Sequence, residues 1–223
     1  MLKVFVPQYD RPTQDNARLA NHAFPNSPRY LLLGNSATRA ALHALIADQN
    51  TTSILILAHG DTDCILAQDG VVALNLSDLK TNVGNVLRLA VFAWACRTSQ
   101  KLGQEFHRQA IPGGAWWGYR TTVSAPNPRR TQAFQEVLQY IARGFHQVHT
   151  KSAAEQFFVG LKDLCTHHYF QVVRSMSISG NFSDAHEIAV GLREAWEHLE
   201  VMLPALPQPF DAGTAFNSVL DGV

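Results

Sequence analysis

The segments ILILAHG (residues 54–60) and LRLAVFAWAC (residues 87–96) decide the fold that this sequence predicts. Each is a short apolar run that ends at a side chain capable of chemistry, His59 in the first and Cys96 in the second. Short apolar runs bounded by polar and turn residues are typical of fully buried strands in a parallel sheet. In open α/β sheets, ligands bind at the carboxyl ends of such strands. We therefore expect the imidazole and the thiol to lie on the same rim of one sheet.

The segments before these two complete an alternating pattern of strands and helices. Residues 2–6 and 30–33 are further apolar runs, and residues 37–49 carry apolar side chains at helical spacing after a cap at Asn35 or Ser36. A strand, a helix and a second strand in this order form a βαβ unit, which makes the sheet parallel. The sequence therefore predicts an α/β fold.

Other segments predict a hairpin, another strand and covering helices. The pair Asp69-Gly70 lies between two alternating runs, which is typical of a hairpin over residues 64–76, and Ser77 can cap a short helix after it. The aromatic and β-branched run over residues 115–123 predicts a strand. We also expect a polar loop over residues 8–13, helices over 16–23, 102–110, 131–145, 154–165 and 183–202, and an extended or loosely packed tail after Pro204.

The composition bounds the class of protein. The chain has 223 residues, and we divide it into a main domain over residues 1–150 and a helical extension over residues 151–223 packed on that domain. Lysine plus arginine and aspartate plus glutamate both number 18, so no net charge favours nucleic acid or an anionic membrane. The N-terminus lacks signal-peptide features, and no apolar run is long enough to span a membrane. We expect a soluble, cytoplasmic protein that binds neither nucleic acid nor membranes.

The three cysteines favour neither disulfides nor a metal site. Their number is odd and no CxxC pair occurs, unlike a disulfide framework or a zinc site. We interpret Cys64 as structural and Cys165 as a core residue. The neighbours His167 and His168 lie on different faces of a helix and make a poor metal pair. We expect no metal and no cofactor.

His59, Gly60 and Cys96 are candidates for nucleophilic catalysis. A thiol is a useful nucleophile only as the thiolate, and an adjacent imidazole that takes its proton makes it reactive. The backbone N–H groups of Gly60 and Cys96 could stabilise the charge that develops on a carbonyl oxygen under attack. A cysteine at the end of an apolar strand is, however, more often an inert core residue, and His-Gly pairs are common. Spacing alone leaves both interpretations open.

The block over residues 54–98 resembles the caspase-like fold of cysteine peptidases, and within it the CHAT family. That family has a hydrophobic strand ending in His-Gly, a hairpin with an Asp-Gly-type turn, a short helix, and a strand ending in Ala-Cys followed by a polar residue and Thr. Here these features are residues 55–60, the turn at 69–70 with residues 74–79, and residues 92–98. The resemblance spans residues 1–145 and does not extend past Lys151. It implies a three-layer sandwich in which helices flank a mostly parallel central sheet.

The resemblance also implies roles for individual residues. Cys96 would be the nucleophile, His59 the general base and acid, and the Gly60 N–H part of the oxyanion hole, with no third member of a triad. The specificity pocket would take Asp10 from the end of the first strand, Trp94 from two residues before the cysteine, and the run 117–119 with Tyr119. An acidic Asp10 in that pocket would favour a basic side chain in the substrate. Asp10 as a solvated turn residue is an equally good interpretation.

The function that the resemblance implies is that of a cysteine endopeptidase that cleaves a protein or peptide substrate. Members of such families often act in bacterial defence or programmed death and stay inactive until a protein partner orders the site loops, here residues 61–81 and 125–130. The alternative is a catalytically silent caspase-like module that binds partners through its C-terminal helices. An α/β hydrolase or a nucleotide-binding protein fits less well, since the sequence has no GxSxG elbow and no glycine-rich phosphate loop.

Overall fold

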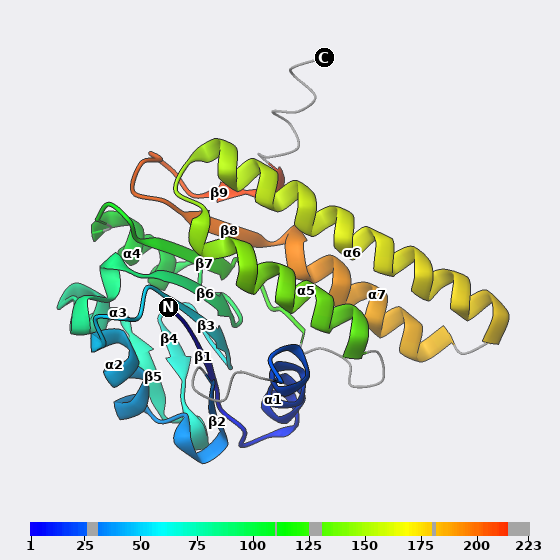
Figure 1. Ribbon diagram of the computed structural model, residues 1–223, viewed down its shortest axis with the longest axis horizontal. Helices are drawn as coiled ribbons and strands as arrows, with labels where there is room; N and C mark the ends of the chain where they lie inside the picture. The colour runs from blue at the N-terminus through cyan, green and yellow to red at the C-terminus, as the bar shows by residue number, and fades with distance from the viewer. Residues whose placement is uncertain (26–30, 110, 125–130, 180–181, 214–223) are drawn as a thin grey trace.

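A seven-stranded sheet lies at the centre of the computed structural model, which describes residues 1–25, 31–109, 111–124, 131–179 and 182–213 (Figure 1). The strands of this sheet are β1 (Leu2–Val6), β2 (Leu31–Leu33), β3 (Ser53–Leu57), β6 (Ala90–Trp94), β7 (Ala115–Tyr119), β8 (Leu199–Met202) and β9 (Phe210–Asp211). A separate hairpin consists of β4 (Cys64–Leu66) and β5 (Val72–Asn75). The α-helices are α1 (Arg11–Ala23), α2 (Arg39–Ala47), α3 (Leu76–Lys80), α4 (Lys101–Gln109), α5 (Thr131–Gly144), α6 (Lys151–Ser179) and α7 (Phe182–Glu197). Short 3-10 helices are η1 (Gly34–Ser36), η2 (Gln68–Gly70), η3 (Val83–Arg88) and η5 (Phe145–Gln147).

The strand order is β2-β1-β3-β6-β7-β8-β9, and the pairs from β2 to β7 are all parallel. Within this sheet, the pairs β7–β8 and β8–β9 are antiparallel. The predicted α/β class with a mostly parallel sheet flanked by helices is therefore confirmed. The chain runs from β1 outward to β2 and then returns to place β3 on the other side of β1. Such a reversal opens a crevice at the carboxyl ends of the strands.

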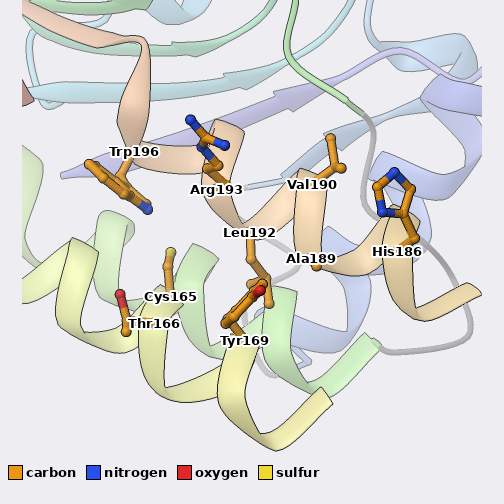
Figure 2. A pocket seen from close by; sticks show the side chains of 9 residues that line it. All are labelled: Cys165, Thr166, Tyr169, His186, Ala189, Val190, Leu192, Arg193 and Trp196. Carbon is orange, nitrogen blue, oxygen red and sulfur yellow. The ribbon is translucent and has the colours of Figure 1, made fainter. Parts of the chain in front are cut away.

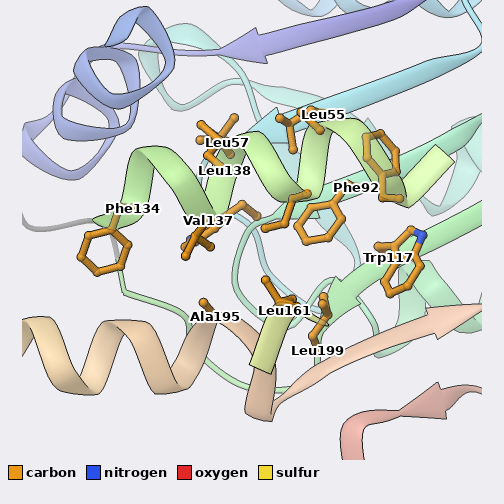
Figure 3. Close-up of a cluster of buried hydrophobic side chains, with 14 of the residues drawn as sticks. Leu55, Leu57, Phe92, Trp117, Phe134, Val137, Leu138, Leu161, Ala195 and Leu199 are labelled. Carbon is orange, nitrogen blue, oxygen red and sulfur yellow. The ribbon is translucent and has the colours of Figure 1, made fainter. Parts of the chain in front are cut away.

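Side chains of the central strands alternate between two apolar cores, one on each face of the sheet. Leu55, Leu57, Phe92 and Trp117 pack against α1, α5, α6 and α7 on one face (Figure 3). On the other face, residues such as Ile56 pack against α2, α3 and α4. Figure 1 shows the two groups of helices on opposite sides of the sheet. Because both faces are buried, the strands read as nearly continuous apolar runs.

Several predicted boundaries need correction. The loop expected over residues 8–13 and the helix expected from Asn16 are wrong in extent, since α1 begins at Arg11 with Asp10 as its N-cap. The carboxylate of Asp10 accepts a hydrogen bond from the Thr13 N–H, and Pro12 lies in the first turn of the helix. Both features favour the start of a helix at this point. The expected caps are also displaced by two or three residues, because Asn75 rather than Ser77 caps α3, and Thr38 rather than Asn35 or Ser36 caps α2.

The C-terminal region adds strands as well as helices. We predicted a helix over residues 183–202, but α7 ends at Glu197 and β8 then pairs with β7. The tail after Pro204 includes β9, which pairs with β8. The free side of β7 offers backbone hydrogen bonds to β8, and β8 in turn offers them to β9. The free energy gained from this pairing outweighs the helix propensity of the segment. The division of the chain at residue 150 stays a prediction, although the sheet itself includes residues from both sides of it.

No helix in the described part of the chain is long and apolar enough to cross a membrane.

Candidate active site

His59 and Cys96 lie at equivalent positions beyond two paired strands. Leu57 of β3 is the register partner of Trp94 of β6, and the Ala58 N–H continues the ladder by donating to the Trp94 carbonyl at 3.3 Å. His59 and Cys96 each follow that last pair by two residues. Neighbouring strands are about 4.8 Å apart. The structure therefore brings the two predicted residues to one rim, and both are partly exposed there.

Gly60 lies where the two turns approach each other most closely. A Cβ atom at this position would lie 2.8 Å from Thr98 Cγ2, 2.9 Å from Ala95 Cβ and 3.0 Å from the Cys96 carbonyl oxygen. No larger residue fits without moving the turns apart. On the outside of the same contact, Arg97 and Asp61 form an exposed ion pair at 3.8 Å. The glycine is thus required for the contact between the His59 turn and the Cys96 turn.

Two backbone N–H groups at this contact have no acceptor among the residues that the structure describes. Among the described residues, neither the Gly60 N–H nor the Cys96 N–H donates a hydrogen bond. The residue after Cys96, Arg97, has φ of +58°, a left-handed conformation that is uncommon outside glycine, and its N–H donates to the Thr121 carbonyl at 2.9 Å. Unpaired N–H groups beside a nucleophile are suited to stabilise an oxyanion.

The imidazole of His59 has a carboxylate partner. Its Nε2 lies 2.7 Å from Asp10 Oδ2, and the side chains are 36% and 39% exposed. The ring of Tyr9 lies beside the imidazole at 5.9 Å between centroids. Asp10 was predicted to line a specificity pocket or to be a solvated turn residue, and its contact with His59 was not predicted. The pocket role stays a prediction, but a substrate cation would have to share this carboxylate with His59.

Helix α1 holds the carboxylate of Asp10 in place. Its Oδ1 accepts the Thr13 N–H at 3.0 Å and the Thr13 hydroxyl at 2.7 Å. Burial by itself would raise the pKa of Asp10, but the hydrogen bonds from Thr13 and His59 outweigh it and lower the pKa. Asp10 is therefore ionised at neutral pH and oriented by a 13-residue helix.

The sulfur of Cys96 contacts the segment that follows β7. Its thiol lies 3.6 Å from the Val123 carbonyl oxygen, and the Val123 N–H donates to the sulfur at 3.5 Å. The next residue, Ser124, donates its N–H to Glu194 Oε2 of α7 at 2.8 Å. Helix α7 is thus linked to the segment that covers one side of the thiol.

The two aromatic residues predicted to bind substrate are buried. Trp94 is 1% exposed and Tyr119 is 0% exposed, and both belong to the core that packs against α5 and α7. Trp94 Nε1 donates to the Ser124 carbonyl at 3.3 Å, and the Tyr119 hydroxyl donates to the Ala195 carbonyl at 3.0 Å. Burial raises the pKa of Tyr119 well above its usual range. The structure gives neither side chain a surface that a substrate could contact.

The other cysteines do not join the site. Burial, together with Asp63 and Asp61, raises the pKa of Cys64. Burial alone raises the pKa of Cys165 to about 12. Both groups are held as neutral thiols at physiological pH, which makes them poor nucleophiles. Within the described ranges, no three His, Cys, Asp or Glu side chains gather as a metal site would require.

A separate pocket of about 350 Å³ lies between α6 and α7 (Figure 2). Its lining includes Cys165 and Tyr169 from α6 and His186, Arg193 and Trp196 from α7. It shares no residue with the His59–Cys96 rim. The loop over residues 125–130, which we expected to take part in regulation, lies outside the described residues.

Comparison of the chain with protein-family models, curated proteins and solved structures found no match.

The sequence did not predict the contacts made by Asp10, Val123 and Glu194. The spacing Asp10-x-x-Thr13 with Pro12 between them is a helix-start signal, and it would have placed the Asp10 carboxylate at the end of β1 beside the His59 rim. No local pattern points to Val123 or Glu194, because their contacts depend on how α7 and β8 pack beside β7.

Proposed function

We propose that this chain is a cysteine endopeptidase in which His59 and Cys96 form the catalytic pair. The observation that carries the proposal is the register of β3 and β6, which sets an imidazole and a thiol at equivalent positions on one rim. The close contact at Gly60 and the two N–H groups that have no acceptor among the described residues add features that acyl transfer needs. The resemblance to CHAT-type caspase-like peptidases rests on the motifs in residues 54–98.

The reaction would proceed through a thioester. His59 takes the proton of Cys96, and the thiolate attacks the carbonyl carbon of a peptide bond to form a C–S bond. The N–H groups of Gly60 and Cys96 donate to the resulting oxyanion. His59 then gives its proton to the leaving amine as the C–N bond breaks. Water, activated by His59, attacks the thioester, the C–S bond breaks, and the acid product leaves with Cys96 again as a thiol.

Activation by a protein partner is part of the proposal. In the described state the Cys96 sulfur contacts Val123, and Glu194 holds the adjacent Ser124. A partner that displaced this segment would free the thiol for a substrate. A role in bacterial defence or programmed death, with a protein substrate in the cytoplasm and no cofactor, is proposed from the resemblance alone.

The second candidate is a silent caspase-like module that binds partners. It is favoured by exposed apolar side chains on the described parts of the C-terminal helices, such as Phe170 at 64% exposure, with Tyr169, Val173 and Val190 also exposed. Exposed apolar side chains that cluster on one element are typical of protein interfaces. Under this candidate the Cys96 thiol would have no special reactivity.

An acyl probe on a short peptide distinguishes the two candidates. We expect the probe to label Cys96, and we expect both Cys96→Ala and His59→Ala to abolish labelling. The matched controls are Cys64→Ala, which removes the other partly exposed cysteine, and His22→Ala, which removes an exposed histidine of α1. Labelling at Cys64 or Cys165 instead, or labelling of Cys96 that does not depend on His59, would reject the peptidase.

A further inference from the structure

We propose that Asp10 is a positioning residue that sets the tautomer of His59, so that Nε2 carries the proton and Nδ1 serves as the base toward Cys96. This inference rests on the proposed function and adds a third group to the catalytic pair. It also differs from the pocket role that the resemblance implies for Asp10.

The geometry divides the two oxygens of Asp10 between two partners. Oδ1 accepts from the Thr13 N–H and hydroxyl at the start of α1, while Oδ2 faces His59 Nε2 at 2.7 Å. A helix N-cap requires a side-chain acceptor for the N–H groups of the first turn, and Oδ1 of Asp10 has this role. Oδ2 is therefore the oxygen that remains for the imidazole, and the start of α1 holds it in position.

The chemistry of the pair determines where the ring proton lies. An ionised carboxylate has no hydrogen to give, so a hydrogen bond to it requires a proton on Nε2. In neutral imidazole the other nitrogen is then an acceptor. His59 Nδ1 has no hydrogen-bond partner among the residues that the structure describes. Its lone pair is thus available for the proton of the thiol.

The shared carboxylate makes an asparagine variant especially informative. In Asp10→Asn, the side-chain oxygen must stay at the Oδ1 position to accept the Thr13 N–H, so the amide NH₂ must face His59. An NH₂ group can only donate, and it would force Nε2 to become the acceptor and Nδ1 to carry the proton. Asparagine caps helices as well as aspartate does, so the fold should be retained while the tautomer is inverted. Asp10→Ser is the matched control, because serine also caps but is too short to reach His59.

The test measures the tautomer and the reactivity of Cys96 separately. Nitrogen-15 NMR of the full chain at neutral pH reports which ring nitrogen of His59 carries the proton, and iodoacetamide reports the reactivity of Cys96 without needing a substrate side chain. We expect the Nε2–H form in the wild type and the Nδ1–H form in Asp10→Asn. The rate of Cys96 alkylation should fall on the order of 10²-fold in Asp10→Asn. This loss is smaller than in an enclosed catalytic triad, because the side chains of Asp10 and His59 are partly exposed. The rate should fall by a smaller factor in Asp10→Ser.

The outcomes separate this inference from the proposed function. An unchanged tautomer in Asp10→Asn, or equal alkylation rates in wild type and Asp10→Asn, would overturn the positioning role. A change confined to the preference for Arg or Lys in peptide substrates would overturn it in favour of the pocket role. Inversion of the tautomer with slower alkylation supports the positioning role even if the wild type cleaves no peptide, a result that would count against the peptidase alone.

Discussion

Replacing Gly60 by alanine should push apart the two turns that carry His59 and Cys96. The added methyl group would lie 2.8 Å from Thr98 Cγ2 and 2.9 Å from Ala95 Cβ. Carbon atoms in contact prefer about 3.5 Å or more, so the turns must separate by about 0.6–0.7 Å. Both neighbours are buried at 0% and 1% exposure, and the third, the Cys96 carbonyl, is backbone, so no flexible side chain can yield instead.

This separation has an effect on stability and an effect on reactivity. Overpacking of this kind costs about 1–3 kcal/mol, which urea unfolding would detect as a lower midpoint. A misplacement approaching 1 Å costs up to about 10²-fold in rate, so acyl-probe labelling of Cys96 should slow by at least about tenfold. Both measurements use the same variant and the full chain.

The control is Gly144→Ala at the end of α5. Its methyl group would lie 3.0 Å from the Phe157 ring of α6, at a helix contact that shares no residue with the rim. It should change stability without changing the labelling rate of the folded protein. If Gly60→Ala kept the wild-type unfolding midpoint and labelling rate, the close contact between the two turns would be refuted.

Three further changes test other parts of the structure. Glu194→Ala removes the acceptor of the Ser124 N–H. The loss of one hydrogen bond should speed iodoacetamide labelling of Cys96 roughly two- to tenfold. Slower labelling would contradict a covering role for the segment at Val123 and Ser124. Burial raises the pKa of Cys165 from 9.0 to about 12. As the pH rises, the Cys165 thiol therefore loses its proton in the unfolded chain before it does so in the folded protein. The free energy of unfolding should consequently fall by up to about 1.4 kcal/mol per pH unit between pH 9 and 12. Urea unfolding at several pH values should show a shallower fall in Cys165→Ala, and an unchanged slope would mean that the thiol is not buried. Trp117→Ala empties a fully buried site and should cost about 3–5 kcal/mol by the same method, while a cost under about 1 kcal/mol would place this ring outside the core.

The central part of the fold could be predicted because its signals are local and strong. The runs ending at His59 and Cys96 are apolar on both faces, as parallel strands buried on both sides must be, and the Asp69-Gly70 pair supplies the left-handed residues that the hairpin turn uses. These runs also predicted that both reactive groups would share one rim.

The remaining features depend on contacts between distant residues. Nothing near residue 199 shows that β8 will pair with β7, since that choice is made by the open side of the sheet. The register between β3 and β6 likewise follows from packing on both faces. Trp94 and Tyr119 ended in the core rather than at the rim, because alternation along β6 and β7 turns them toward α5 and α7. The position of Asp10 could have been predicted from the sequence, because Asp10 and Thr13 form a helix-capping signal.

A crystal structure of the protein reacted with a peptide aldehyde would show whether His59, Gly60 and Cys96 together form a catalytic site. The thiolate of Cys96 would add to the aldehyde carbon, and the resulting oxygen resembles the oxyanion of the transition state. This oxygen should lie about 2.7–3.1 Å from the N–H groups of Gly60 and Cys96, with His59 beside the adduct. An adduct on another cysteine, or an oxygen directed away from both N–H groups, would contradict it.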